Sequence, residues 1–284
     1  MTNKSPNKEN VHQKDESAVV SEAQEAPDQE YSDYTDTELM VTIAARELRD
    51  GESVLVGVGV PNLACNLAKR THASDLRMFY ESGTIDSNPR SLPLSIGDPV
   101  LASGAAGLVP MYEGFSKYLQ AGRIDVGFLG GAQIDKYGNI NSTVIGEYDD
   151  PKVRLPGSGG ACEIASNSHR TLVITQHQKR RFPEEVDFVT SPGYLDGDTS
   201  REELGLRGGP EAVITDLAVM RFDDDGEMYV ESLHPGVSRE DVQAATGWEL
   251  SFADETGTTE TPTTDEIRLL REELDPDGLY IGGG

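Results

Sequence analysis

The sequence has few cysteines and no long apolar run. Cys65 and Cys162 are its only cysteines, too few for a disulfide framework or a tetrahedral thiolate zinc site. No stretch of 18 apolar residues occurs, which argues against a membrane-spanning helix. The opening residues, MTNKSPNKENVHQKDE, lack the apolar core of a signal peptide. We therefore expect a soluble, cytoplasmic protein.

Basic residues are also scarce. The 284 residues include 24 Lys and Arg against 50 Asp and Glu, for a net charge of −26. Residues 1–36 account for −6 of this charge and the remainder for −20, so the acidity belongs to the folded body. Such a surface repels nucleic acid and anionic membranes. Adaptation to a saline cytoplasm explains it best because salt screens the self-repulsion; the alternative is an unusually soluble protein of ordinary habitat.

The chain divides into a polar tail and one domain. Residues 1–34 contain almost no large aliphatic side chains, so we predict a disordered acidic tail there and a folded domain over 35–284. Thr35 and Glu38 have the spacing of a capping box, which predicts a helix starting at once. Gly51 is placed to end that helix.

Apolar strands then alternate with helical segments. We predict strands over 53–57, 76–80, 124–129, 171–175, 188–189 and 212–215, with helices over 62–70 and 115–121 among them. A hairpin over 219–230, a short helix over 238–246, a linker over 252–264 and a helix over 264–274 complete the chain. The alternation indicates the α/β class, with an open, mostly parallel sheet covered by helices on both faces.

Glu81 is the first candidate for chemistry. It directly follows the predicted strand 76–80, and open α/β sheets bind ligands outside the carboxyl ends of their strands. Ser82 and Gly83 come next, and a glycine lets the backbone approach a ligand closely. Such an acid can equally cap a helix or pair with a base.

Three glycine-rich segments follow later strands. They cover 130–133, 137–142 and 155–161. Glycines there permit positive φ and expose N–H groups that can hold an anion or an oxyanion. Tight turns in a compact fold are the alternative.

Taken together, these segments resemble the B subunits of family I CoA-transferases, glutaconate CoA-transferase above all. The resemblance runs in order over about residues 35–276. Its motifs are GVGVP at 57–61, ESG at 81–83, GGAQIDKYGNIN at 130–141, GSGG at 157–160, KRRF at 179–182, VTSPG at 189–193 and REELDP at 271–276.

The resemblance implies a fold of the CoA-transferase, or NagB/RpiA-like, type and a mechanism. In this family a glutamate attacks an acyl-CoA thioester and then carries CoA as a glutamyl thioester, and Glu81 occupies that position. Because each tetrahedral intermediate bears an oxyanion, N–H donors are needed. We expect Gly157, Gly159 and Gly160 to supply them. Gln133 either orients the glutamate, donates to the oxyanion, or makes a structural hydrogen bond.

The resemblance also implies partners and ligands. Family members combine A and B subunits with the active site between them, so we expect an A subunit and an A2B2 unit or a multiple of it. Coenzyme A thioesters are substrates, and neither a bound cofactor nor a metal is implied. A short dicarboxylate such as glutaconate is the nearest analogy, with 3-oxoacids and aromatic acids as alternatives.

Four other functions fit parts of the sequence. A dinucleotide-binding motif would need a third glycine where Asn62 stands. A serine-hydrolase elbow around Ser158 would need glycine at Pro156. A purely scaffolding subunit would not need Glu81. An acyl-CoA hydrolase on the same scaffold stays open, since water can attack the same intermediates.

Overall fold

The computed structural model describes residues 33–89 and 91–282. Apart from Asp33 and Tyr34, the predicted disordered tail over 1–34 lies outside the described residues. The division into a tail and a single domain over 35–284 therefore stays a prediction.

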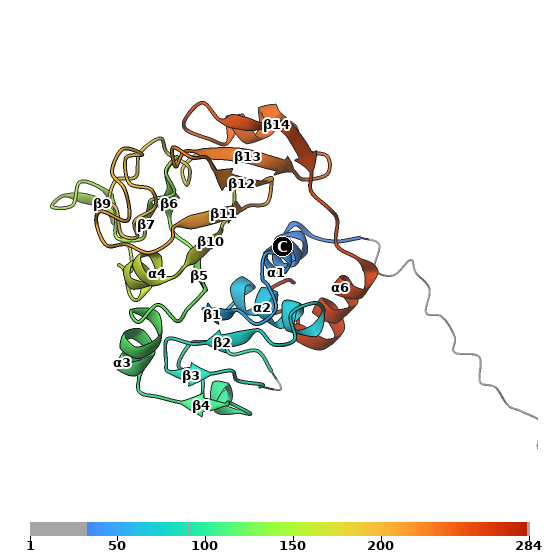
Figure 1. Cartoon of the computed structure of the whole chain (residues 1–284). Coiled ribbons are helices and arrows are strands. Elements are labelled where there is room, and N and C mark those ends of the chain that lie inside the picture. Colours follow the sequence, from blue (N-terminus) through green and yellow to red (C-terminus); the bar gives the residue numbers. More distant parts are fainter. Residues whose placement is uncertain (1–32, 90, 283–284) are drawn as a thin grey trace, which may run out of the picture.

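One mixed sheet of ten strands organises the molecule (Figure 1). Its order is β14-β13-β12-β11-β10-β5-β1-β2-β3-β4, and five of its nine pairings are parallel. The strands are β1 (Ser53–Leu55), β2 (Arg77–Phe79), β3 (Thr84–Ile85), β4 (Gly107–Leu108), β5 (Val126–Leu129), β10 (Arg170–Ile174), β11 (Pro210–Ile214), β12 (Ala218–Phe222), β13 (Met228–Leu233) and β14 (Ser251–Thr258). Two small hairpins pair β6 (Gln133–Ile134) with β7 (Ile140–Asn141), and β8 (Val144–Gly146) with β9 (Pro151–Arg154).

Helices cover both faces of this sheet, which confirms the predicted fold class (Figure 1). On one face lie α1 (Asp36–Arg46), α2 (Val60–Arg70), and α6 (Thr264–Arg268) with its π-helical continuation η3 (Leu269–Leu274). On the other lie α3 (Met111–Glu113) with the π-helix η2 (Gly114–Leu119), and α4 (Ala161–Asn167). A 3-10 turn, η1 (Pro99–Ala102), and α5 (Arg239–Ala244) lie in the connections. Each face has its own apolar core, as burial on both sides of parallel strands requires.

The start of α1 is as predicted and its end is not. Thr35 Oγ1 accepts from the Glu38 N–H at 3.2 Å, and the Glu38 carboxylate accepts from the Thr35 N–H at 2.8 Å, which is the expected capping box. The helix stops at Arg46, because Leu48 N–H donates to Ala45 O in a tighter final turn. Gly51, at φ +80°, belongs instead to the turn before β1.

Two predictions in the second half are wrong. Residues 188–189 form no strand, since Phe188 stacks on Tyr148 and the nearby backbone pairing is an isolated bridge from Ser191 to Ile140. Residues 251–258, predicted mainly as linker, form β14. Its backbone pairs in parallel with β13, so the strand depends on a neighbour rather than on apolar content. The hairpin β12–β13 and the last helix are confirmed.

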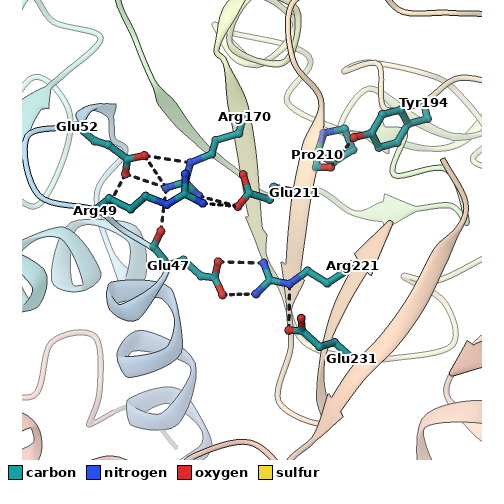
Figure 2. Close-up of polar contacts among 9 residues, drawn as sticks. All are labelled: Glu47, Arg49, Glu52, Arg170, Tyr194, Pro210, Glu211, Arg221 and Glu231. Carbon is teal, nitrogen blue, oxygen red and sulfur yellow. Dashed lines mark hydrogen bonds and ion pairs between the residues drawn. The ribbon is translucent and has the colours of Figure 1, made fainter. Parts of the chain in front are cut away.

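Ion pairs fasten α1 to the amino edge of the sheet. Figure 2 shows Arg221 between Glu47 and Glu231, with nitrogen–oxygen distances of 2.6 and 3.0 Å. Arg170, at the start of β10, contacts Glu52 at 2.8 Å. Arginine suits such sites because its planar guanidinium binds a carboxylate with two parallel hydrogen bonds. Arg170 lies at the amino end of β10, whereas Glu81 follows the carboxyl end of β2, which runs parallel to it. The ion pairs and Glu81 therefore lie at opposite edges of the sheet.

Candidate active site

Glu81 lies in the tight turn that joins β2 to β3, at the carboxyl edge of the sheet. Tyr80 N–H donates to Thr84 O at 2.9 Å, and Gly83 N–H to Tyr80 O at 2.8 Å. Gly83 has φ +95°, and a Cβ there would overlap the carbonyl oxygen of Val109. Because only glycine fits, Gly83 fixes the turn that presents Glu81 and Ser82.

The Glu81 carboxylate is half-buried and unpaired. Within the described residues it accepts no hydrogen bond and forms no ion pair. Desolvation by burial raises its pKa above the ordinary value. The surrounding cavity is mainly apolar, with Leu55, Phe79 and Phe115 among its lining residues. A carboxylate without partners in such a place is a more reactive nucleophile than one solvated by water.

Gly160 lies against this carboxylate. A Cβ built on Gly160 would be 2.8 Å from Glu81 Oε1 and 2.7 Å from Phe115 Cζ. Its φ is −83°, an ordinary value, so space rather than backbone conformation accounts for the glycine. The fold thus brings together Glu81 and the 157–160 loop, which lie far apart in the sequence.

The rest of the 157–160 loop is fixed by hydrogen bonds to Ser142, and it has open space beside its glycines. Gly157 N–H donates to Ser142 O at 2.8 Å, and Ser142 Oγ to Gly157 O at 2.9 Å. Gly157 and Gly159 have φ of +97° and +51°, and a Cβ on either would meet open space. In the described part of the chain the N–H groups of Gly159 and Gly160 donate no hydrogen bond. They are therefore available to a ligand.

Gln133 is engaged elsewhere. Its Oε1 accepts from Asn141 Nδ2 at 2.6 Å and from the Asp187 N–H at 3.1 Å, while its Nε2 donates to Asp187 Oδ2 at 3.1 Å. Both ends of the side chain thus have partners, and none of them is Glu81. Of the roles left open from the sequence, a structural hydrogen bond is the one that these contacts favour.

Phe115 and Val109 belong to the site although the sequence did not single them out. Phe115 packs against Gly160 and lines the cavity beside Glu81, and the Val109 carbonyl group packs against Gly83. Phe115 was predicted only as part of a helical segment, and nothing in its local pattern separates a site residue from a core one. Ser82 Oγ lies 3.4 Å from Thr84 Oγ1, within the same turn.

Residues 33–89 and 91–282 contain neither a metal centre nor a membrane-spanning helix. No group of three or more His, Cys, Asp or Glu side chains there could hold a metal ion. No helix in that part of the chain combines the length and apolar character needed to cross a bilayer.

A half-buried carboxylate beside a glycine-rich loop, at the carboxyl edge of an open α/β sheet, is an arrangement of groups that acyl transfer would require. The family model described as coenzyme A transferase matches residues 37–245. The chain therefore belongs to the coenzyme A transferase family.

Individual relatives agree with this assignment. The B subunit of 3-oxoadipate CoA-transferase from Pseudomonas knackmussii is 49% identical over 242 residues, covering 84% of this chain and 93% of that one. The B subunit of glutaconate CoA-transferase from Acidaminococcus fermentans is 40% identical over 259 residues, or 89% and 97% of the two chains. The crystal structure of that enzyme matches with a TM-score of 0.83 over 88% of this chain and 98% of that chain, at 39% identity.

A more distant relative has a different reaction in its name. The cholesterol ring-cleaving hydrolase IpdB subunit from Mycobacterium tuberculosis is 28% identical over 249 residues, covering 86% of this chain and 96% of that one.

The chain described here is a CoA-transferase subunit of the B type, as its motifs indicated.

Proposed function

We propose that Glu81 is the nucleophile of a CoA-transferase that moves CoA between an acyl-CoA and a free carboxylic acid. The observation that carries the proposal is the unpaired, half-buried Glu81 carboxylate packed against Gly160. The carboxylate attacks the thioester carbonyl and expels CoA thiolate, which leaves an acyl–glutamyl anhydride. The thiolate then attacks the glutamyl carbonyl, releases the first acid and forms a glutamyl–CoA thioester. An acceptor carboxylate reverses these steps and leaves as its CoA ester.

The glycine loop supports this chemistry. Each tetrahedral intermediate carries an oxyanion, and a preorganised N–H donor stabilises such a charge by about 3–4 kcal/mol. The N–H groups of Gly159 and Gly160 donate no hydrogen bond to the described residues. We therefore assign them as the hydrogen-bond donors to the oxyanion. Gly157 positions the loop through its two hydrogen bonds with Ser142.

The proposal includes an A subunit, in an A2B2 unit or a multiple of it. Both CoA-transferase relatives are named as B subunits. Leu108, Met111 and Tyr112 are 56–67% exposed, and they flank Val109, which touches Gly83 of the Glu81 turn. Exposed apolar side chains beside a site are typical of an interface. We infer that the A subunit covers this side of Glu81.

For the substrate we propose a short dicarboxylic acid and its CoA ester. Glutaconate and 3-oxoadipate, in the relatives' names, are both dicarboxylic acids. The strongly acidic composition supports a saline cytoplasm as the site of action.

An acyl-CoA hydrolase is the second candidate. One relative is named a hydrolase, and the cavity beside Glu81, at about 10 Å³, has room for about one water molecule. Water attacking the anhydride or the glutamyl thioester would release free CoA and acid.

The test uses the complex of this chain with its A subunit. Glutaconyl-CoA or 3-oxoadipyl-CoA is incubated with a labelled free acid, and the label is followed into acyl-CoA. Glu81→Gln should abolish exchange, whereas Glu163→Gln, on the helix behind the loop, should retain it. Borohydride should inactivate the wild type only after acyl-CoA is added, because it reduces a glutamyl thioester. Release of free CoA and acid alone would establish the hydrolase instead, and exchange by Glu81→Gln would remove Glu81 as nucleophile.

A further inference from the structure

A basic loop lies on the same edge of the sheet as Glu81. Strands β1, β2, β5 and β10 are mutually parallel, so the segments leaving their carboxyl ends share one edge. Among these segments, residues 56–59, 80–83 and 130–132 contain no Lys or Arg. Residues 175–182, after β10, contain Lys179, Arg180 and Arg181 in succession. Of the segments that directly follow these four strands, the one after β10 therefore carries the positive charge.

The loop presents its first two cations to solvent. Lys179 and Arg180 are exposed. Neither forms an ion pair with the described residues, although the chain holds about twice as many acids as bases. Arg180 Nε donates to Gln178 Oε1 at 2.9 Å, which leaves its terminal nitrogens free in the described structure. Unpaired cations on a surface of opposite charge are suited to bind an anion.

The third base holds the loop in place. Arg181 Nη1 donates to Gly131 O at 3.0 Å, and Arg181 O accepts from the Ile134 N–H at 2.7 Å. Phe182 is fully buried and stacks on His177 with ring centroids 4.1 Å apart. The loop is thus anchored on both sides of its exposed cations. Less conformational entropy is lost when such a preorganised loop binds a ligand.

Hydrogen bonds connect this loop to the Glu81 site. Arg181 O accepts a hydrogen bond from the Ile134 N–H, and Gln133, the neighbour of Ile134, accepts one from Asn141. Ser142, which follows Asn141, is hydrogen-bonded to Gly157. Gly157 belongs to the same loop as Gly160, which touches Glu81. Phe182 and the cavity residues Leu55, Phe79 and Phe115 all belong to the same apolar core. The basic loop and Glu81 therefore lie on one continuous rim and one face.

The lateral distance between β2 and β10 is close to the length of the pantetheine arm of CoA. Strand β10 is three strands from β2, a lateral distance of about 14 Å at about 4.8 Å per strand. The pantetheine arm of CoA has about 13 bonds from its sulfur to the first phosphorus, which in an extended chain span about 15 Å. The arm of an acyl-CoA whose thioester lies at Glu81 is therefore long enough to cross the strands that separate Glu81 from the basic loop.

We propose that Lys179 and Arg180, positioned by Arg181, bind the phosphate groups of the coenzyme A moiety. The proposal rests on the proposed function, since it requires an acyl-CoA whose thioester lies at Glu81. CoA is strongly anionic, and a protein of net charge −26 would otherwise repel it. Arginine binds phosphate through paired N–H groups, while lysine acts as a point charge.

The test compares CoA with pantetheine, which lacks the phosphates, in calorimetric titrations of the complex with the A subunit. K179Q/R180Q should weaken CoA binding by roughly 10- to 100-fold and leave pantetheine binding unchanged. The control R49Q/R207Q removes two exposed bases that lie outside the carboxyl-edge loops and should change neither affinity. Unchanged CoA affinity in K179Q/R180Q, or an equal loss for both ligands, would overturn the proposal.

Two further readouts separate the possible failures. Gel filtration should show K179Q/R180Q assembled with the A subunit; loss of assembly would make these bases interface residues and overturn the proposal. A third outcome is that K179Q/R180Q binds CoA more weakly than the wild type does, but the wild type shows no acyl exchange. In that case the assignment of Glu81 as nucleophile fails and the phosphate site stands.

Discussion

The Glu81 carboxylate occupies the space that a side chain on Gly160 would need: a Cβ at that position would lie 2.8 Å from Glu81 Oε1. The distance is shorter than real Cβ contacts allow, so one of the two groups would have to move. A carboxylate that must meet a thioester carbon has little tolerance for such displacement, because small errors in alignment cost much of the rate.

The first prediction follows from this contact. Gly160→Ala should lower kcat for acyl exchange by about 100-fold while leaving the fold intact, because φ at Gly160 is ordinary. The matched control is Gly97→Ala, where the nearest atom to a new Cβ is 3.9 Å away. Steady-state kinetics and circular dichroism of both variants provide the measurement. Near-wild-type kcat in Gly160→Ala would contradict the described contact.

The second prediction concerns the pH dependence of exchange. Glu81 must be ionised to attack, and burial raises its pKa, so activity should fall with decreasing pH at a value above the ordinary glutamate pKa of 4.5. Phe115→Asn, which admits water, should shift this acid limb to lower pH. Tyr148→Asn, an exposed aromatic on the β8–β9 hairpin, should not. The measurement is the profile of kcat/KM against pH. If Phe115→Asn left the acid limb unchanged, desolvation of Glu81 would not be the cause of that limb.

The third prediction concerns His177 and stability. Burial lowers the pKa of His177 to about 4, below its ordinary value, so between the two values the unfolded chain binds a proton that the folded chain does not. Stability should therefore fall as pH drops from about 6.5 toward 4, with His177 contributing about 2 kcal/mol of loss between about pH 7 and 5. His177→Gln should reduce that loss.

Urea denaturation at about pH 7 and about pH 5 measures it. The exposed His169→Gln should keep the wild-type pH dependence. An identical loss in the wild type and His177→Gln would show that other groups cause it.

The fourth prediction tests the ion pairs of Figure 2. Arg221→Leu leaves Glu47, whose side chain is 15% exposed, without its partner, which should lower the free energy of unfolding by about 2–3 kcal/mol. Arg49→Gln removes a pair whose arginine is 68% exposed and should cost less than about 1 kcal/mol. Acyl exchange should survive both changes at a permissive temperature. Equal losses from the two variants would argue that burial does not set the strength of these pairs.

The fifth prediction concerns salt. Because the net charge is −26, raising KCl from about 0.1 to about 1 M shortens the screening length from about 10 to about 3 Å and should raise Tm by roughly 5 °C or more. Sucrose at equal osmolarity controls for solute exclusion. A Tm that is constant or falls with KCl would refute adaptation to a saline cytoplasm.

Local sequence patterns predicted the parts of the fold that depend on local chemistry. The capping box at Thr35, the apolar strands and the β12–β13 hairpin all follow from residues close together in the chain. Strand β14 could not be predicted in this way, because Ser251–Thr258 has few strand-forming side chains and is ordered by pairing with β13.

The site shows the same limit. Glu81 was placed at the end of a strand from its neighbours alone, and its turn depends on Gly83. Its contact with Gly160 and Phe115, and the engagement of Gln133 by Asn141 and Asp187, join residues far apart in the sequence or depend on side-chain direction. No spacing rule encodes such contacts. The resemblance to a family identified Gly160 as a candidate, but the packing supplies its physical reason.

The position of the two charged regions on opposite edges of the sheet has a consequence for evolution. The arginine–glutamate pairs hold the amino edge, and the loops that present Glu81 and Lys179 leave the carboxyl edge. Substitutions at the exposed positions of those loops, such as Lys179 and Arg180, leave the ion pairs that stabilise the scaffold intact. A lineage with this architecture can therefore exchange one acid or one reaction for another by drift in a few short segments, while the chain continues to fold.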